Sequence, residues 1–308
     1  MKTTGSRAFE SLPHVVEFTE FRGSRASAPT VLLEVPHGAT RASHFDEVRA
    51  KLAGDYPADL RDFFFVNTDV GAPELANAIA ALHVEADAGA WCVVARCLVP
   101  RTFVDCNRVI EVAQRPYADG GERPSRGGGV TPGLHVYVTD EGDRALLLER
   151  YQSYVRSIEA AYEAVVPHGG RALMVHSYAP RSLDVPVDER IVERLRAEYE
   201  PSRIEHWPLR PDIDVIADDP SGTRIAAPEL VKALVTAGDA LEFDVGISRT
   251  YALHEGTLAA SLGRRYVGKT LCFEVRRDHL VGTFTPFSEM EADPSRVDRI
   301  ARAIVSAL

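Results

Sequence analysis

The chain has 308 residues, a formal net charge of −10, 45% hydrophobic residues and 26% charged residues. This composition is typical of a globular protein, and the negative charge disfavours a nucleic-acid partner, because binding to phosphates needs a basic surface. The N-terminus lacks the apolar core of a signal peptide, and no apolar run approaches the roughly 18 residues of a membrane helix. The four cysteines show neither CxxC spacing nor the density of a disulfide framework. We therefore expect a reduced, cytoplasmic protein with no membrane partner.

Short apolar runs bounded by Gly, Pro or Asp alternate along the chain with segments of helical periodicity. Strands separated by helices are typical of an α/β fold, with a mostly parallel or mixed central sheet and helices on both faces. The runs that predict strands are residues 30–35, 63–66, 91–95, 171–175, 241–245 and 270–275. The patterns that predict helices cover residues 73–82, 147–165, 188–199, 228–236, 256–264 and 294–308.

One irregular segment, around residues 112–134, is too rich in Gly, Pro and Arg to supply a core. It is either a surface excursion or a loop over a binding site. No linker divides the chain, so we expect a single α/β domain over residues 1–308.

Polar side chains stand at the carboxyl ends of predicted strands, where ligands of open α/β sheets bind. His37 and His176 directly follow apolar runs, Asp69 lies between the second predicted strand and the next helix, and Glu274 lies inside the last strand. Each has a structural alternative. A strand-end histidine can be incidental, Asp69 can cap the next helix, and Glu274 can be a charge on an edge strand.

Two histidines and one carboxylate from separate strand ends form a three-ligand zinc shell with an open fourth position. A further carboxylate nearby would then act as general base toward water. Such a shell needs no short spacing, and the chain has no HExxH, GxSxG, Walker A or strand-linked GxGxxG motif. The combination favours a Zn²⁺-dependent hydrolytic site over a serine hydrolase or a nucleotide-binding site.

The stretch "ARCLVPRTFVDCNR" concentrates Arg96, Arg101, Asn107 and Arg108 just after a predicted strand. A guanidinium grips a carboxylate through two parallel hydrogen bonds. In an acidic chain this cluster favours an anion-binding role, although a solvated basic segment is the simpler alternative.

Five stretches, "EVPHGAT", "NTDVGAPEL", "RTFVDCNR", "VHSY" and "LCFEVRRD", resemble in this order the N-formylglutamate amidohydrolase family. The similarity runs from about residue 31 to residue 278. It implies a phosphorylase/hydrolase-like α/β fold, similar to that of the zinc carboxypeptidases, and it implies a Zn²⁺ cofactor. The roles implied are metal binding by His37, Asp69 and His176, catalysis by Glu274, and binding of the substrate carboxylate by Arg101, Asn107 and Arg108.

The carboxylate ligand is the least secure of these roles, because Glu34 stands three residues before His37 and is a rival to Asp69. The chain also departs from the family pattern. Met174 occupies the position of an Asp two residues before the second histidine, and the Gly-rich substrate segment expected after residue 240 is unclear. Arg249 and His254 are the substrate-binding candidates in that region, which reads "GISRTYALHEGT".

We therefore expect a zinc-dependent amidohydrolase that cleaves the amide bond of a small N-acyl amino acid, such as N-formylglutamate, with Glu274 as general base. A zinc peptidase or cell-wall amidase acting on another carboxylate-bearing amide is an alternative, and a metal-free anion-binding module is a second. The sequence leaves the metal identity and the oligomeric state open.

Overall fold

The computed structural model describes residues 7–110, 133–185 and 188–308. The irregular segment predicted around residues 112–134 lies almost wholly outside these residues. Within them, the strands are β1 (Val16–Arg22), β2 (Val31–Val35), β3 (Trp91–Cys97), β4 (Arg171–Tyr178), β5 (Ile213–Ile216), β6 (Val245–Ile247) and β7 (Thr270–Arg276).

The described helices surround this set of strands. They are α1 (Ala42–Arg49), α2 (Leu60–Asn67), α3 (Ala72–Ala86), α5 (Glu141–Val165), α6 (Ile191–Glu198), α7 (Pro201–Ile204), α8 (Pro228–Ala240), α9 (Leu258–Arg265) and α10 (Pro294–Val305), with short 3₁₀ helices η1 (Arg7–Phe9) and η2 (Arg277–His279).

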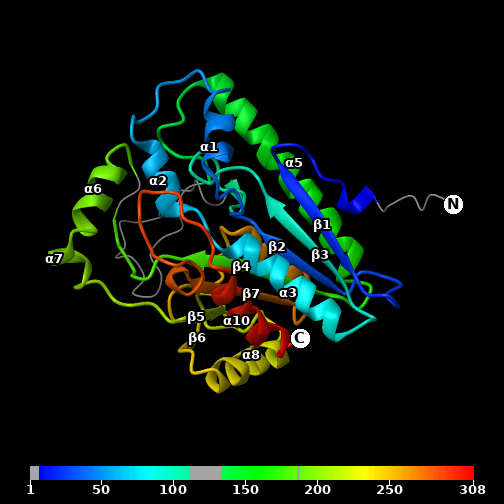
Figure 1. Ribbon diagram of the computed structural model, residues 1–308. Coiled ribbons are helices and arrows are strands. Elements are labelled where there is room, and N and C mark those ends of the chain that lie inside the picture. Colours follow the sequence, from blue (N-terminus) through cyan, green and yellow to red (C-terminus); the bar gives the residue numbers. More distant parts are fainter. Residues whose placement is uncertain (1–6, 111–132, 186–187) are drawn as a thin grey trace.

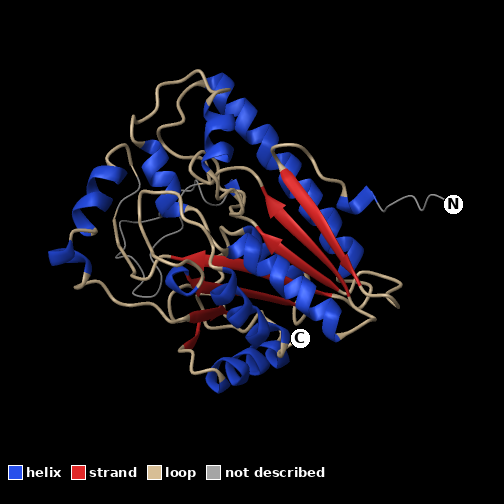
Figure 2. Cartoon of the chain, in the orientation of Figure 1, coloured by secondary structure: helices blue, strands red, loops and turns tan. Residues whose placement is uncertain are grey.

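The strands form one sheet in the order β1-β3-β2-β4-β7-β5-β6 (Figure 2). The central strands β3, β2, β4 and β7 are parallel to one another. At the edges, β1 is antiparallel to β3, and β5 is antiparallel to β7 while β6 is parallel to β5. The sheet is therefore mixed, and the carboxyl ends of its four central strands meet at one edge.

Helices cover both faces of the sheet, as predicted. One face buries residues such as Leu33 and Phe273 against α3, α8 and α10, which lie together beside the sheet in Figure 1. The other face buries Leu32, Met174 and Cys272 together with residues of α1, α2, α5, α6 and α9. Because successive side chains in a strand point to opposite faces, the odd and even positions of the central strands divide between two cores.

Two predicted strands are wrong. Residues 63–66 belong to helix α2, in which Leu60 and all of Phe63, Phe64, Phe65 and Val66 are buried. A short apolar run that is buried all round has no periodicity to separate helix from strand. Residues 241–245 mostly follow the end of α8, and the strand β6 begins only at Val245.

Strands β1 and β5 were not predicted. The exposed edge strand β1 carries charged residues, and β5 is only four residues long. Neither segment therefore forms a clear apolar run bounded by turn residues.

A buried carboxylate anchors the start of the long helix α5. Asp143 accepts hydrogen bonds at 2.9 Å each from the backbone N–H groups of Ala53 and Gly54 and from the hydroxyl of Tyr56. Burial opposes its charge, yet these donors hold the pKa of Asp143 below its ordinary value. The ionised carboxylate therefore links α5 to the loop before α2.

We expect Asp143→Asn to lower the free energy of unfolding by about 2 kcal/mol at neutral pH, because hydrogen bonds to a charged acceptor are lost. A carboxyl whose pKa is depressed in the folded state stabilises above its unfolded pKa of about 4 and loses this effect as the pH falls. Urea unfolding at pH 7 and pH 3.5 should therefore show that the free energies of unfolding of the wild type and Asp143→Asn differ less at the lower pH. Glu141→Gln, in the same helical turn but exposed, is the matched control and should change little. Equal losses at both pH values would contradict this role of the charge.

Candidate active site

The strand β2 ends in a tight turn that fixes His37. The N–H of Gly38 donates to the carbonyl of Val35 at 3.2 Å, and the Nε of Arg96 donates to the carbonyl of Gly38 at 2.8 Å. A Cβ at Gly38 would lie 2.6 Å from the Cγ of Arg96 and 3.0 Å from the carbonyl oxygen of Cys97, so the end of β3 leaves no room for a side chain there. The turn therefore holds the imidazole at the carboxyl edge of the sheet.

Asp69 follows a helix rather than a strand, since it lies in the loop from α2 to α3. Its side chain does not cap α3, which has Gly71 at the N-cap with a φ of 84°. A Cβ at Gly71 would lie 2.6 Å from the side chain of Leu280, so both the backbone conformation and the packing require glycine. The loop thereby turns Asp69 toward the edge of the sheet.

His37, Asp69 and His176 converge, although they lie far apart in the chain. The Oδ2 atom of Asp69 lies 3.2 Å from the Nδ1 of His37 and 3.0 Å from the Nδ1 of His176, which lies within β4. All three side chains are almost fully buried, with 2–4% exposure. One ligand atom from each lies within 4.8 Å of the others, and the group could hold a metal ion. Two imidazole nitrogens and a carboxylate oxygen match the donor set of a three-ligand zinc site.

The electrostatics of this group favour positive charge. Burial opposes ionisation of Asp69, but the two histidines hold the pKa of its carboxyl below its ordinary value. The pKa of His176 lies well above its ordinary value, because the hydrogen bond to Asp69 outweighs the burial that lowers it. The buried carboxylate of Asp69 thus attracts positive charge, and a metal ion that binds here displaces the proton of His176.

The other oxygen of Asp69 is held by two arginines. Its Oδ1 lies 3.7 Å from the Nη2 of Arg277 and 3.9 Å from the Nη1 of Arg101. Arg277 is buried, and it also donates to the carbonyls of Val66 and Ser177. It thereby joins the end of α2 to the end of β4. The sequence motif "EVRRD" contains Arg277, but nothing in its spacing indicates this role.

Glu34, the rival carboxylate, lies in a different environment. Its two oxygens accept hydrogen bonds from Tyr154 at 2.9 Å and Tyr162 at 2.8 Å. Burial raises the pKa of its carboxyl, and the two tyrosines only partly oppose this effect. Both oxygens therefore have partners in α5, and burial disfavours the charged form of the carboxyl that a metal ligand takes.

Asp105 contacts both the histidine group and the arginines that follow β3. The Nε2 of His37 donates to its Oδ1 at 2.8 Å, and the Nη2 of Arg101 donates to its Oδ2 at 2.9 Å. The Nη2 of Arg108 lies 3.6 Å from the same Oδ2. Burial opposes its charge, but the two arginines and His37 hold the pKa of Asp105 well below its ordinary value.

The hydrogen bond to Asp105 uses the Nε2 of His37. Its other nitrogen, Nδ1, faces Asp69 and the ring of His176. A metal-binding histidine commonly donates its second N–H to a carboxylate in this way. Asp105 stands in the quoted motif "RTFVDCNR", so the signal was present, but its role was not predicted.

Arg101 and Arg108 both lie beside Asp105, and Arg101 also lies 3.9 Å from the Oδ1 of Asp69. Asn107 serves the fold as well, because its side-chain oxygen accepts the N–H of Ala259 at 3.0 Å at the start of α9. A ligand contact from Asn107 would therefore come from its amide nitrogen.

Glu274 lies beside His176 on the sheet. The two residues are partners in the register of β4 and β7, and hence their side chains leave the same face. Within the described residues, the carboxylate of Glu274 makes no hydrogen bond or ion pair. Burial raises the pKa of its carboxyl, and the charge of Asp69 raises it further against the opposing effect of His176. Glu274 is therefore a stronger proton acceptor than an exposed glutamate.

The remaining two sequence candidates are not brought to the histidines by any described contact. The guanidinium of Arg249 pairs with Asp244 at 2.6 Å, and its side chain is 52% exposed. His254 accepts the N–H of Gly256 through Nδ1 at 3.0 Å, in the loop before α9, and lies within electrostatic range of Arg108.

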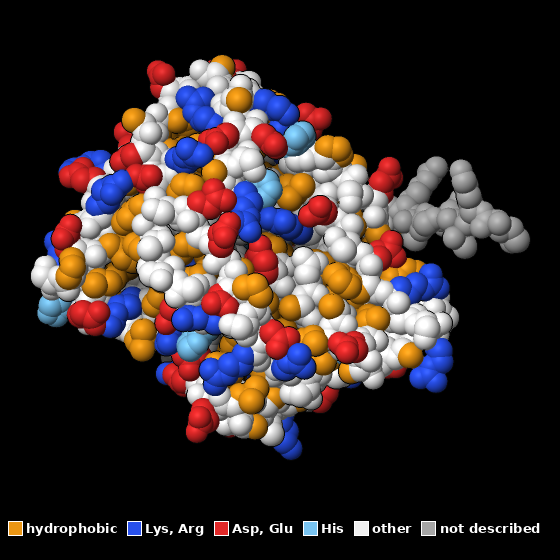
Figure 3. All heavy atoms as spheres, in the orientation of Figure 1, with side chains coloured by type: hydrophobic (Ala, Val, Ile, Leu, Met, Phe, Trp, Pro, Cys, Tyr) orange, Lys and Arg blue, Asp and Glu red, His pale blue; other side chains and the backbone are white. Residues whose placement is uncertain are grey.

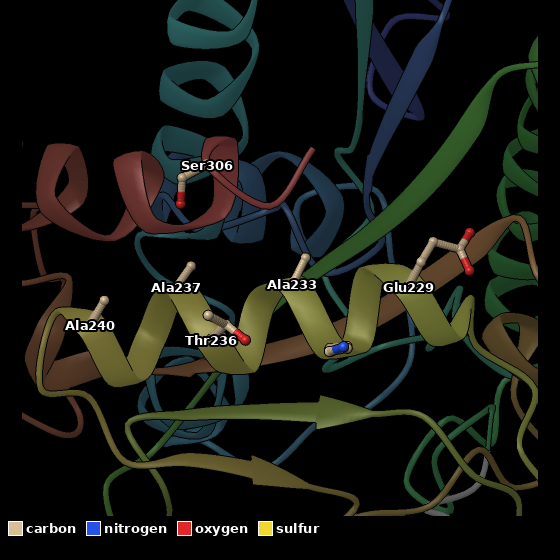
Figure 4. A pocket seen from close by; sticks show the side chains of 7 residues that line it. Glu229, Ala233, Thr236, Ala237, Ala240 and Ser306 are labelled. Atoms are coloured by element: carbon tan, nitrogen blue, oxygen red, sulfur yellow. The ribbon is translucent and has the colours of Figure 1, made fainter.

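A separate groove of about 460 Å³ lies between α8 and α10 (Figure 4). Small side chains line it, including Ala233, Ala237 and Ser306. These helices cover the face of the sheet opposite to His176 and Glu274. The groove is therefore not part of the histidine site.

Comparison with known proteins decides the family. The model of the N-formylglutamate amidohydrolase family matches residues 30–281, which cover all five sequence stretches. The chain belongs to the N-formylglutamate amidohydrolase family. It is accordingly a hydrolase that acts on carbon–nitrogen amide bonds.

Among solved structures, the chain resembles two proteins over most of its length. An N-formylglutamate amidohydrolase from Ralstonia eutropha JMP134 is 18% identical, with a TM-score of 0.55 over 94% of this chain and 95% of that one. The gene product Atu2144 from Agrobacterium tumefaciens is 17% identical, with a TM-score of 0.48 over 94% of this chain and 90% of that one. No curated protein sequence matches the chain.

The surface of this amidohydrolase carries intermingled charges of both signs on the face that Figure 3 displays. No helix in the described part of the chain is both long and apolar enough to cross a membrane.

Proposed function

We propose that the chain hydrolyses the amide bond of an N-acyl amino acid, such as N-formylglutamate, with a Zn²⁺ ion held by His37, Asp69 and His176. The observation that carries the proposal is the convergence of Asp69 Oδ2 on the Nδ1 atoms of His37 and His176, at 3.2 and 3.0 Å. Beside them lies Glu274, whose carboxylate has no hydrogen bond or ion pair with any described residue. A bound Zn²⁺ supplies Lewis-acid chemistry, which polarises a carbonyl oxygen and lowers the pKa of water.

In this proposal Glu274 moves the proton. Its carboxylate accepts a proton from the attacking water while the water oxygen bonds to the amide carbon. It then delivers that proton to the nitrogen as the carbon–nitrogen bond breaks, so that the acid and the amine leave with atoms and charge balanced. The raised pKa of Glu274 suits the first step, because burial makes its carboxylate a stronger proton acceptor than an exposed glutamate.

Arg101 and Arg108 orient the substrate. Asp105 holds the two side chains next to each other, and their guanidinium groups bind the carboxylate of the amino acid. Asp105 also accepts the hydrogen bond of His37. One side chain therefore holds both the arginines that bind the substrate and a histidine that binds the metal. This common anchor fixes the amide bond relative to Glu274.

A substrate screen tests this function. Zinc-loaded protein is incubated with N-formyl-L-glutamate, N-acetyl-L-glutamate and a glutamyl dipeptide amide, and release of free amine is measured. We expect the N-formyl substrate to be cleaved with release of formate. Faster cleavage of the peptide would favour a peptidase, and binding without any turnover would favour the anion-binding module.

A further inference from the structure

The two oxygens of the Asp69 carboxylate face opposite surroundings. Its Oδ2 lies 3.2 Å from the Nδ1 of His37 and 3.0 Å from the Nδ1 of His176. Its Oδ1 lies instead 3.7 Å from the Nη2 of Arg277 and 3.9 Å from the Nη1 of Arg101. One oxygen therefore faces two imidazoles that can bind a metal, and the other faces two cations.

The guanidinium of Arg277 is held in place through all three of its nitrogens. Arg277 directly follows β7 and is only 3% exposed. Its Nη1 donates to the carbonyl of Val66, its Nη2 to the carbonyl of Ser177 at 3.2 Å, and its Nε to the Oγ of Ser177 at 3.4 Å. The positive charge beside Asp69 is therefore fixed by the ends of α2 and β4.

Asp69 supplies the counter-charge of Arg277. In residues 7–110, 133–185 and 188–308, it is the one carboxylate that forms an ion pair with this arginine. Arg101 has a nearer partner, because its Nη2 lies 2.9 Å from the Oδ2 of Asp105. A buried guanidinium is costly without a negative partner, so the fold favours the orientation in which Oδ1 of Asp69 faces Arg277.

A divalent cation would meet these charges differently at the two oxygens. Binding through both oxygens of Asp69 would bring the metal beside Oδ1, where the charges of Arg277 and Arg101 repel it. Binding through Oδ2 alone keeps the metal on the side of the imidazoles. One carboxylate oxygen, two imidazole nitrogens and one open position suit tetrahedral Zn²⁺, whereas Mn²⁺ is typical of octahedral sites with more oxygen ligands.

We propose that Arg277 is a positioning residue that restricts Asp69 to binding metal through Oδ2 alone, and that it thereby makes the site selective for four-coordinate Zn²⁺ over six-coordinate Mn²⁺. The inference rests on the proposed function for the three metal ligands, but it does not depend on the reaction.

Metal affinities test this role without measuring hydrolysis. The Kd values of Zn²⁺ and Mn²⁺ are measured by competition with a fluorescent chelator. We expect Arg277→Gln to reduce the preference for zinc, taken as the ratio of the two Kd values, by about 10- to 100-fold, the usual effect on metal affinity of losing the partner of a ligand. Arg276→Gln is the matched control and should keep the wild-type preference, because Arg276 pairs with Asp212 at 2.9 Å and Asp278 at 2.8 Å.

The visible spectrum of the Co²⁺-loaded protein reports the coordination number. Four-coordinate Co²⁺ absorbs strongly in the visible range, and six-coordinate Co²⁺ absorbs weakly. We expect the strong spectrum for the wild type and a weaker one for Arg277→Gln, because Oδ1 of Asp69 becomes available to the metal. Arg277→Lys keeps the positive charge and should keep the wild-type spectrum.

A merely structural role of Arg277 would weaken the binding of both metals equally, and the unchanged ratio would overturn the inference. A six-coordinate spectrum of the wild type would also overturn it, and that measurement does not require any variant to fold. Zinc binding with the expected preference but without hydrolysis of N-formyl-L-glutamate would contradict the proposed function and support this inference.

Discussion

Replacing Glu274 by glutamine is expected to lower kcat for hydrolysis by about 10²- to 10⁴-fold, the usual contribution of a general acid–base group. Glutamine keeps the size of the side chain but cannot accept the proton of water. Because the carboxylate of Glu274 has no hydrogen bond or ion pair within the described residues, the substitution should leave the melting temperature nearly unchanged. Initial rates under substrate saturation, together with thermal unfolding, measure both effects.

Retained metal is the control for this variant. Glu274 is not a member of the group of ligand atoms, and we expect Glu274→Gln to bind as much zinc as the wild type. A variant that keeps more than a tenth of the wild-type kcat would contradict the role of Glu274 as general base. A variant that loses its metal would instead make Glu274 a ligand.

The second large effect concerns the carboxylate beside the histidines. We expect Asp69→Asn to weaken zinc binding by more than about 100-fold, since altering even the partners of metal ligands costs 10- to 100-fold. Glu34→Gln should leave zinc affinity almost unchanged and lower the free energy of unfolding by about 1 kcal/mol, because one tyrosine hydrogen bond is weakened. Competition with a fluorescent chelator measures the affinities.

These two variants form a matched pair, since each turns a buried acid near the histidines into its amide. If Glu34→Gln weakens zinc binding and Asp69→Asn does not, the ligand assignment is reversed. If both variants weaken zinc binding equally, the substitutions would be disturbing the folded structure rather than removing a ligand.

The central strands could be predicted from the sequence because their apolar runs are short, β-branched and bounded by turn residues. Helix α2 could not be predicted, because its run of three phenylalanines is buried on every side and shows no helical or strand periodicity. The family resemblance, the α/β fold with a mixed sheet and the amide hydrolase class are confirmed by the family match and the sheet.

The site was only partly predictable. His37 and His176 carried a signal, as polar residues at the ends of apolar strands. Asp69 was chosen as a polar residue after a predicted strand, but the segment before it is helix α2. Asp105 and Arg277 could not be assigned roles, because these depend on contacts between segments far apart in the chain. A spacing pattern does not encode such contacts.

The most direct test of the account is a titration of activity against bound zinc. Metal is removed from the protein with a chelator, and the protein is exchanged into chelator-free buffer. Hydrolysis of N-formyl-L-glutamate is then measured as zinc is added, and elemental analysis gives the zinc content of each sample. The account predicts no hydrolysis without metal and a linear rise that stops at one zinc per chain. Full hydrolysis by the stripped protein, or zinc binding that survives the double substitution His37→Ala and His176→Ala, would contradict it.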